Sequence, residues 1–482
     1  MEDKDGRFGP FRWQLLAEVA VGALLTTGFH STIVAQGNQR YFNGTEYFSP
    51  TVVLISFDGF RADYLDRGLT PHLTNIVHEG GFQAEYLIPS FPSSTFPNHY
   101  SIVTGLYPGS HGIVSNIFDD PDTGHTFHHK DKKCQQRSEW WGGEPIWVTA
   151  ELHGQKTAVD MWAGVEAPIK GKRATYSESF DRVVTPKDKV DRILTWLDLP
   201  NSDRPTFVAS YFSEIDRAGH HFSPDSDQVN NELRQADAAV SYLQEQLRKR
   251  NLHDIVNVIY LSDHGMAPVG SDSFLVVNEL VDESRFEAIE GLPLGLLFPK
   301  NYNDTQAIYN ELEEKHRSLS KNGVHVPWKV YLKADLPSRF HYSTHGRIAP
   351  IILLPNPGYI FIRKQDFEAR HKKVIQGEKV AYGTHGYDNL DKTMRAIFLA
   401  HGPDFRLSQS TLWAHDKGRF LDVIPTFTPQ GGESIPKEVA QPVKLHPAFT
   451  NTEVYGLICQ ILGFPPAPND GTLNWEYTTS TA

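Results

Sequence analysis

The chain has 482 residues and a formal net charge of −12, which results from 46 basic and 58 acidic side chains. Such an acidic balance argues against a surface that binds a nucleic-acid polymer, because those surfaces are normally basic. It does not exclude small phosphorylated ligands, since bound cations can supply positive charge locally. With 39% hydrophobic and 22% charged residues, the composition is that of an ordinary globular protein.

Residues 1–47 are predicted to form an N-terminal tail. An apolar run at residues 19–25 resembles part of a secretory signal, but it is shorter than the roughly 20 apolar residues that cross a bilayer. We expect a degraded signal or membrane anchor here, and a secretory-pathway protein that is extracellular-facing, vacuolar or membrane-associated. The glycosylation acceptors Asn43-Gly-Thr45 and Asn303-Asp-Thr305 favour the same route, and hence a glycoprotein.

From about residue 48 the chain alternates predicted strands with predicted helices. Strands are expected at residues 51–57, 206–212, 255–261 and 396–400, with a strand pair at 350–355 and 359–363. Helices are expected at residues 71–80, 99–105, 229–251 and 454–462. This alternation favours an α/β fold with a mainly parallel central sheet and helices on both faces. The polar, irregular stretch at 265–345 is interpreted as an insertion, so residues 48–482 are predicted to be one domain.

The two cysteines, Cys134 and Cys459, lie far apart and lack CxxC spacing. A zinc site built from thiolates is therefore not expected. The two residues form either a single disulfide or two free thiols.

Three of the predicted strands end on an aspartate. The strand at 51–57 runs into Asp58, the strand at 206–212 is followed by Asp216, and the strand at 255–261 runs into Asp263. In an open α/β sheet, ligands bind beyond the carboxyl ends of the strands. Three carboxylates at that edge predict a metal site.

Three histidines extend this set of predicted metal ligands. His220 follows Asp216 by four residues, which places both side chains on one face of a helical turn. His264 directly follows the aspartate of the third strand, and His385 lies between two glycines, where the backbone can approach a ligand closely. The three aspartates and three histidines make six nitrogen and oxygen ligands, which is enough for a two-zinc cluster with room for substrate.

A nucleophile is expected near residue 95. The loop Ser93-Ser94-Thr95 precedes a predicted helix, with Pro97 in its first turn. At a helix N-terminus the helix dipole stabilises negative charge, and a nearby metal lowers the pKa of a hydroxyl. Thr95 fits this position, and Ser93 and Ser94 remain alternatives on local grounds.

Seven motifs occur in order along the chain: Ser56-Phe-Asp58-Gly-Phe-Arg61, Thr95-Phe-Pro-Asn-His-Tyr100, Gly112-Ile-Val-Ser-Asn116, Pro145-Ile-Trp147, Asp216-Arg-Ala-Gly-His220, Ser262-Asp263-His264-Gly-Met266 and His385-Gly-Tyr-Asp-Asn389. Together they resemble the ectonucleotide pyrophosphatase/phosphodiesterase family of the alkaline phosphatase superfamily, over roughly residues 50–465. The resemblance implies an alkaline-phosphatase-like fold and two Zn²⁺ per chain. It implies that Asp216, His220 and His385 bind one ion, and that Asp58, Thr95, Asp263 and His264 bind the other. It also implies that Thr95 is the nucleophile.

The same resemblance implies a substrate pocket. Asn116 and the backbone N–H of Phe96 are expected to bind a phosphate oxygen, and Phe96 and Tyr211 to stack on a nucleobase. Trp162 is a weaker candidate for the same pocket. The remaining tryptophans and histidines of these segments are expected to be structural: Trp140, Trp141, Trp147, His99, His111, His341 and His345.

The resemblance implies hydrolysis of phosphodiester and pyrophosphate bonds in nucleoside triphosphates, dinucleotides and nucleotide sugars. Nucleoside 5′-monophosphates would leave by way of a covalent threonine intermediate. The chain lacks the cysteine-rich and nuclease-like modules of animal relatives and resembles leaner microbial or fungal members. The alternatives are a phosphomonoesterase or a phospholipid-headgroup phosphodiesterase of the same superfamily, and more remotely an inactive binding ectodomain.

Overall fold

The computed structural model describes residues 40–270, 273–291, 293–375, 383–406 and 445–473. The apolar run at residues 19–25, predicted to be a degraded signal or anchor, lies outside the described residues. Within the described ranges, no helix has the length and apolar character needed to span a bilayer. Cys134 and Cys459 are both buried, free thiols, which decides between the two states left open by the sequence.

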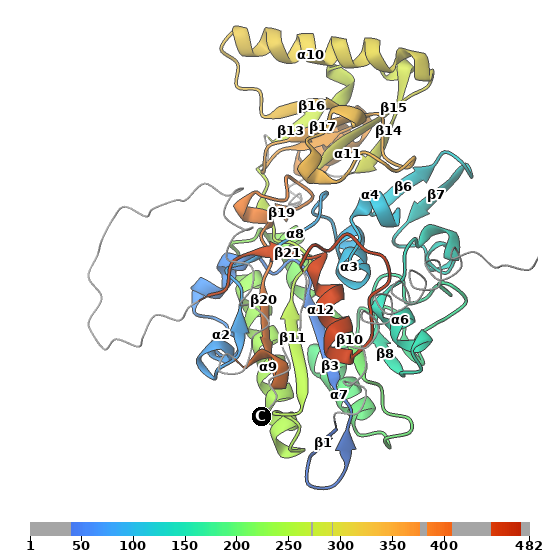
Figure 1. Ribbon diagram of the computed structural model, residues 1–482. Coiled ribbons are helices and arrows are strands. Elements are labelled where there is room, and N and C mark those ends of the chain that lie inside the picture. Colours follow the sequence, from blue (N-terminus) through green and yellow to red (C-terminus); the bar gives the residue numbers. More distant parts are fainter. Residues whose placement is uncertain (1–39, 271–272, 292, 376–382, 407–444, 474–482) are drawn as a thin grey trace, which may run out of the picture. The chain divides into compact units, whose positions relative to one another are not determined.

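A seven-stranded sheet forms the centre of the fold, in the order β4-β20-β11-β3-β10-β8-β9. Its members are β3 (Thr51–Phe57), β4 (Phe82–Gln83), β8 (Thr157–Asp160), β9 (Tyr176–Glu178), β10 (Phe207–Phe212), β11 (Val256–Leu261) and β20 (Phe398–His401). The five strands β11, β3, β10, β8 and β9 run parallel, and β20 is antiparallel to β11 (Figure 1). The predicted mainly parallel sheet is confirmed.

Strand β3 lies in the middle of the sheet and is buried along its whole length. Its side chains alternate between two hydrophobic cores, with Val52 and Leu54 in one and Val53 and Ile55 in the other. A continuous apolar run of this kind is typical of a parallel strand that is covered on both faces.

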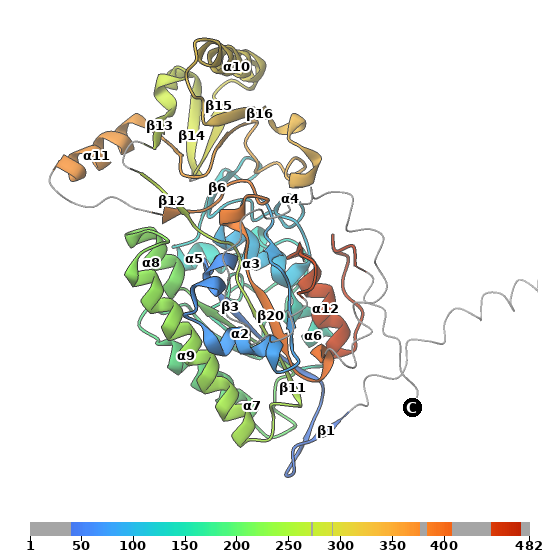
Figure 2. The same cartoon turned by 90° about the vertical axis from the view of Figure 1, so that its left-hand side faces the viewer.

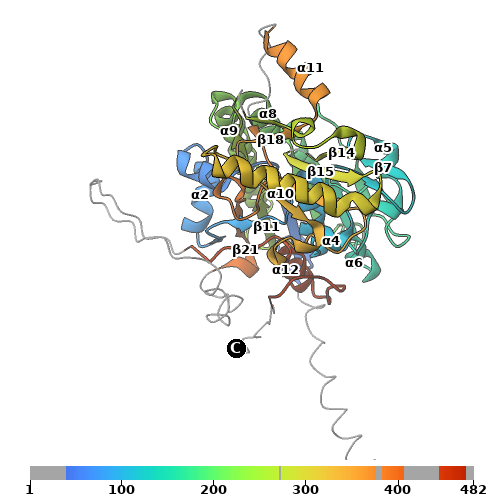
Figure 3. The ribbon, with the colours of Figure 1, turned by 90° about the horizontal axis from the view of Figure 1, so that it is seen from above.

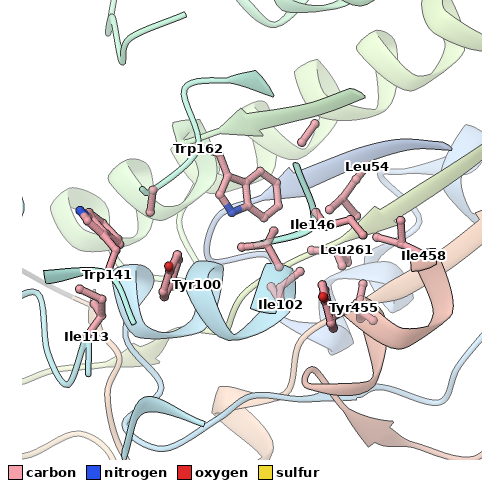
Figure 4. Packing of buried hydrophobic residues seen from close by; sticks show 14 of the residues in the cluster. Leu54, Tyr100, Ile102, Ile113, Trp141, Ile146, Trp162, Leu261, Tyr455 and Ile458 are labelled. Atoms are coloured by element: carbon pink, nitrogen blue, oxygen red, sulfur yellow. The ribbon is translucent and has the colours of Figure 1, made fainter. Parts of the chain in front are cut away.

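Helices cover both faces of the sheet, as predicted. One core contains side chains of α3 (Thr95–Thr104), α6 (Ile146–Leu152) and α12 (Glu453–Leu462). The other contains side chains of α2 (Pro71–His78), α7 (Pro186–Leu197), α8 (Glu214–Phe222) and α9 (Asp227–Lys249). Figure 2 shows α8 and α9 on one side of the sheet and α6 and α12 on the other. Figure 4 shows Ile102 of α3 packed among Leu54, Leu261 and Ile458.

The helices begin where their sequences supply caps. The side chain of Thr185 accepts from the N–H of Asp188 and forms a capping box ahead of α7. The hydroxyl of Ser226 accepts from the N–H of Val229 at the start of α9. In α9 the apolar residues at helical spacing are buried, and this confirms the amphipathic helix predicted at 229–251.

The insertion contains regular structure, although its sequence was expected to be irregular. Strands β14 (Phe286–Gly291), β15 (Leu294–Pro299), β16 (Trp328–Leu332) and β17 (Ile351–Pro355) form a sheet in the order β14-β15-β17-β16. Helix α10 (Thr305–Lys321) lies over this sheet (Figure 3). Its residues Ile308 and Leu312 are buried in a hydrophobic core that is separate from the two cores of the central sheet. The stretch looks polar in sequence because the other faces of α10 are exposed.

The strand pair predicted across Asn356-Pro-Gly358 is wrong. Strand β17 pairs with β15 and β16, and β18 (Ile360–Ile362) pairs in parallel with β13 (Phe274–Val276). All five residues of β17 are buried, which fits a strand with partners on both edges. The turn therefore joins strands of two different sheets.

The remaining elements are short, apart from helix α11 with its 12 residues. The strands are β1 (Tyr41–Phe42), β2 (Tyr47–Phe48), β5 (Leu87–Ile88), β6 (Ile117–Asp120), β7 (His125–His128), β12 (Ala267–Pro268), β19 (Gly383–Thr384) and β21 (Phe449–Thr450). The helices are α4 (Pro108–His111), α5 (Lys132–Gln135) and α11 (Lys364–Ile375).

Candidate active site

The three aspartates that follow the strands meet at one edge of the central sheet. Strands β11, β3 and β10 are neighbours and parallel, so their carboxyl ends lie side by side. The N–H of Asp216 donates to the carbonyl of Asp58 over 3.1 Å, and the N–H of Gly59 donates to Oδ1 of Asp263 over 3.2 Å. The backbone that follows β3 thus bonds to the backbone of Asp216 and to the carboxylate of Asp263.

Asp216, His220 and His385 form the first group of possible metal ligands. Oδ1 of Asp216 lies 3.3 Å from Nε2 of His220 and 3.4 Å from Nε2 of His385, and the two nitrogens are 3.1 Å apart. Nδ1 of His220 lies 2.9 Å from the carbonyl oxygen of Gly383, and Nδ1 of His385 lies 2.9 Å from that of Ser93. A proton on each Nδ1 satisfies these carbonyls and leaves each Nε2 free to bind a metal.

Asp58, Asp263 and His264 form the second group. Nε2 of His264 lies 2.9 Å from Oδ2 of Asp263 and 3.5 Å from Oδ1 of Asp58. Oγ1 of Thr95 lies 3.3 Å from the same nitrogen. The rings of His264 and His385 stack with centroids 3.6 Å apart, so the two groups adjoin each other.

The carboxylate oxygens of both groups fit a cation. Oδ1 of Asp58, Oδ1 of Asp216 and Oδ2 of Asp263 are buried, and none accepts an aligned hydrogen bond from the described residues. Oδ2 of Asp263 has only ion-pair contacts, with Nε2 of His264 at 2.9 Å and Nδ1 of His99 at 3.2 Å. A buried, unsatisfied polar atom typically costs about 1–3 kcal/mol, and more for a charged group. Carboxylate and imidazole ligands together suit zinc and similar divalent metals. The residues present therefore fit the metal centre that the sequence predicts.

The pKa values show how strongly these groups interact. Burial raises the pKa of Asp58 well above its ordinary value, and the charges of Asp216 and Asp263 raise it further. Burial alone would raise the pKa of Asp216 as well, but His220 and His385 hold it well below its usual range. Three carboxylates at such short range repel one another, and a bound cation would relieve that repulsion.

Glycines allow the close approach of these segments. Gly59 has φ +69°, and a Cβ there would lie 2.9 Å from Cα of Asp216. A Cβ on Gly383 would lie 2.5 Å from the carbonyl oxygen of Gly219, which precedes His220 in α8. A side chain at either position would push the ligand-bearing segments apart.

Thr95 is the first residue of α3 and lies beside the second group. The two alternative serines are buried, and the hydroxyl of Ser93 donates to the carbonyl of Tyr387 over 3.2 Å. The structure thus brings Thr95, rather than Ser93, to the predicted ligands.

Asn116 lies at the same helix end. Its Oδ1 accepts a hydrogen bond of 2.9 Å from the backbone N–H of Phe96. That N–H is therefore already occupied, in contrast to the expectation that it binds phosphate. The bond orients the amide so that Nδ2 of Asn116 remains as the donor for an anion.

The predicted base pocket is only partly brought together. The ring of Phe96 is half-buried. The hydroxyl of Tyr211 donates to Oδ2 of Asp58, so this residue also contacts the ligand set. Trp162 is 2% exposed and donates to the carbonyl of His99 over 3.0 Å, a packing that does not favour its predicted contact with substrate.

Two residues near the site escaped the sequence analysis. Phe180 is 38% exposed, and its ring centroid lies 6.1 Å from that of Tyr211. His99, expected to be structural, contacts both Thr95 and Asp263. Its place one helical turn after Thr95 is the signal that could have revealed it, whereas Phe180 follows a short strand in a polar segment and gives no such signal.

An α/β sheet with paired carboxylate and histidine groups at its carboxyl edge is the architecture of alkaline-phosphatase-like hydrolases. The family model for type I phosphodiesterase / nucleotide pyrophosphatase matches residues 52–388. The chain belongs to this family, and it is a hydrolase of nucleotide pyrophosphate and phosphodiester bonds.

Named relatives agree with this assignment. The chain is 42% identical to an uncharacterized pyrophosphatase/phosphodiesterase of Schizosaccharomyces pombe, over 89% of this chain and 80% of the relative. It is 34% identical to the bis(5′-adenosyl)-triphosphatase enpp4 of Xenopus laevis, over 89% of this chain and 81% of that protein. It is 35% identical to ectonucleotide pyrophosphatase/phosphodiesterase family member 3 of Bos taurus, of which it spans 43%.

Solved structures show the same fold. Murine ectonucleotide pyrophosphatase/phosphodiesterase 5 superimposes with a TM-score of 0.71 at 28% identity, over 88% of this chain and 97% of the murine chain. An inactive threonine-to-alanine variant of that murine protein, in complex with AMP, matches equally well.

Proposed function

We propose that the protein is a two-zinc nucleotide pyrophosphatase/phosphodiesterase with Thr95 as its nucleophile. The observation that carries the proposal is the position of Thr95 Oγ1 at the first residue of α3, 3.3 Å from Nε2 of His264 and beside buried, unpaired carboxylate oxygens. Asp216, His220 and His385 would hold one zinc, and Asp58, Asp263 and His264 with Thr95 would hold the other. When bound, the ions would lower the pKa of the threonine hydroxyl and of a water, and neutralise charge on phosphoryl oxygens.

The reaction proceeds in two displacements at phosphorus. Thr95 Oγ1 forms a bond to phosphorus while the bond from phosphorus to the leaving oxygen breaks, which gives a nucleoside monophosphate ester of Thr95. Water then attacks the same phosphorus, the Oγ1–phosphorus bond breaks, and the nucleoside 5′-monophosphate leaves. Nδ2 of Asn116 and the positive end of the α3 dipole stabilise the charge on the phosphoryl oxygens.

Nucleotides are the proposed substrates, including nucleoside triphosphates, dinucleotides and nucleotide sugars. Exposed aromatic surface beside the ligands supports this class, because an aromatic ring can stack on any nucleobase. The murine neighbour that binds AMP and the Xenopus relative named for a dinucleoside triphosphate support it further. Relatives named as venom and ectonucleotide enzymes support a protein of the secretory pathway.

The experiment compares Thr95→Ala and Thr95→Ser with the unaltered protein, after metal analysis of each. Substrates are a p-nitrophenyl nucleotide ester, ATP, a dinucleoside polyphosphate, a lysophospholipid and p-nitrophenyl phosphate. We expect two bound zinc ions, no turnover by the alanine variant, partial turnover by the serine variant, and preference for nucleotide diesters and pyrophosphates. Near-normal turnover by the alanine variant, or preference for the monoester or lipid, would contradict the proposal.

A further inference from the structure

His99 is a buried histidine that contacts the proposed site without belonging to either ligand group. It lies in α3, one turn after Thr95, and is 1% exposed. Its Nδ1 lies 2.9 Å from the carbonyl oxygen of Thr95 and 3.2 Å from Oδ2 of Asp263. Its Nε2 lies 2.9 Å from the hydroxyl of Ser56, on strand β3.

These contacts determine which ring nitrogen carries the proton. Nδ1 faces a backbone carbonyl and a carboxylate, and both can only accept, so the proton must be on Nδ1. At the other ring nitrogen, Nε2 forms its hydrogen bond with the hydroxyl of Ser56. The ring is also fixed in orientation, because it packs edge-to-face against Trp162 and Tyr211 with centroids 5.0 and 4.9 Å away.

The order Ser56, His99, Asp263 has the connectivity of a serine-hydrolase triad. A nucleophilic role is excluded by burial, because Ser56 is 0% exposed and lies beneath the ligand-bearing edge of β3. A serine hydroxyl can donate or accept, so Ser56 adapts to the tautomer that the two acceptors at Nδ1 set. The proton on Nδ1 faces these two groups, which belong to the site.

We propose that His99 is a positioning residue that joins Asp263 to the first turn of α3. Its Nδ1 bonds to the backbone carbonyl of Thr95 and makes an ion-pair contact of 3.2 Å with Oδ2 of Asp263. One ring thus contacts both segments and fixes the distance between a metal ligand and the nucleophile. This inference rests on the proposed function, which assigns those roles to Asp263 and Thr95. Hydrogen bonds to ligating carboxylates are known to control metal affinity.

Two polar replacements of His99 distinguish a positioning role from a contribution to packing alone. In His99→Asn the side-chain amide nitrogen can occupy the place of Nδ1 and donate to Asp263. In His99→Gln the amide lies near the place of Nε2, where it meets Ser56 and cannot reach the carboxylate. The matched control is His111→Gln, because His111 is also 1% exposed and bonds to a serine hydroxyl, Ser101, over 3.0 Å.

The primary measurement is zinc affinity and stoichiometry by competition with a chromogenic chelator, with thermal unfolding of the zinc-free proteins alongside. We expect His99→Gln to lower the affinity for one of the two zinc ions by about 10–100-fold. The zinc affinities of His99→Asn should stay within about threefold of those of the unaltered protein. The control should lower the unfolding temperature but keep both zinc affinities. Single-turnover rates should follow zinc affinity across the series.

The outcomes also separate this inference from the proposed function. If the unaltered protein does not bind two zinc ions, the proposed function fails. If it does, and His99→Gln binds both ions as tightly, or His99→Asn loses as much affinity as His99→Gln, the positioning role is wrong. Equal loss in the His111→Gln control would likewise overturn it.

Discussion

The hydroxyl of Tyr211 donates a hydrogen bond to Oδ2 of Asp58, so a residue predicted to stack on a base is also bound to a predicted metal ligand. This bond favours the charged form of Asp58 and lowers its pKa, against the larger effect of burial, which raises it. The aromatic ring and the hydroxyl of Tyr211 thus have separate consequences that can be measured.

Tyr211→Phe keeps the ring and removes the hydroxyl. We expect kcat to fall about tenfold, because the net value of one such hydrogen bond is about 1–1.5 kcal/mol, while KM for a nucleotide ester changes less than about twofold. Steady-state kinetics on a p-nitrophenyl nucleotide ester checks this. Unchanged kcat would show that the hydroxyl has no role, and that stacking alone explains the residue.

Phe180→Ala tests the exposed ring that lies beside Tyr211. If this ring contacts the base, its removal should raise KM about tenfold with kcat retained, since stacking on an aromatic side chain contributes about 1–3 kcal/mol per base. Phe180→Tyr is the control, because it keeps an aromatic face. A simple ester without a base should not distinguish the variants, and equal KM values for the nucleotide would remove Phe180 from the pocket.

Lys189→Met breaks a buried ion pair that supports α8, the helix of Asp216 and His220. Nζ of Lys189 lies 2.8 Å from Oε1 of Glu214, the first residue of that helix, and the lysine side chain is 2% exposed. The single variant leaves a carboxylate without its partner and should lower the free energy of unfolding by about 3 kcal/mol.

The double variant Lys189→Met/Glu214→Met removes both charges and should recover most of that loss. Denaturant unfolding of the three proteins forms the comparison. A double variant that is less stable than the single one would mean that the pair itself, rather than the unpaired charge, accounts for the stability.

His401 gives a pH dependence that is separate from the active site. Burial lowers its pKa from 6.5 to about 3, with smaller effects of His253 and Arg248, so the folded protein keeps it neutral. Between these values the unfolded chain binds a proton that the folded protein does not. Stability is therefore lost as pH falls below about 6.5, by about 1.4 kcal/mol per pH unit for this one group.

His401→Gln should remove that contribution. Between pH 6 and pH 4, we expect its unfolding free energy to fall less steeply than that of the unaltered protein. The slopes should differ by the value for one proton, about 1.4 kcal/mol per pH unit, and should be equal above pH 7. Urea unfolding at a series of pH values gives both slopes. Parallel curves over the whole range would show that His401 has the same pKa in the folded and unfolded states.

The sequence predicted the parts of the site that lie close to regular elements. Long apolar runs identify β3, β10 and β11, and parallel strands bring Asp58, Asp216 and Asp263 to one edge whatever the rest of the chain does. The spacing of Asp216 and His220 holds because both residues lie in one helix.

What the sequence did not predict depends on contacts between distant segments. The hydroxyl of Tyr211 and the ring of His99 acquire their partners only when the strands and α3 pack together. The sheet of the insertion is built from strands far apart along the chain, so β17 was paired with the neighbouring segment instead of with β15 and β16. Exposure, which distinguishes Phe180 from Trp162, is also a property of the packed molecule.

Gly219 and Gly383 lie in close contact, and this contact sets the spacing of the first ligand group because Gly383 has no side chain. Here a backbone carbonyl occupies the space that a methyl group would need, so the distance from His220 to His385 is fixed by main chain on both sides. A relative could keep every predicted ligand and still lose this spacing through one alanine in place of Gly383. Inspection of the ligand residues alone would therefore overestimate how many such sequences can bind the metal.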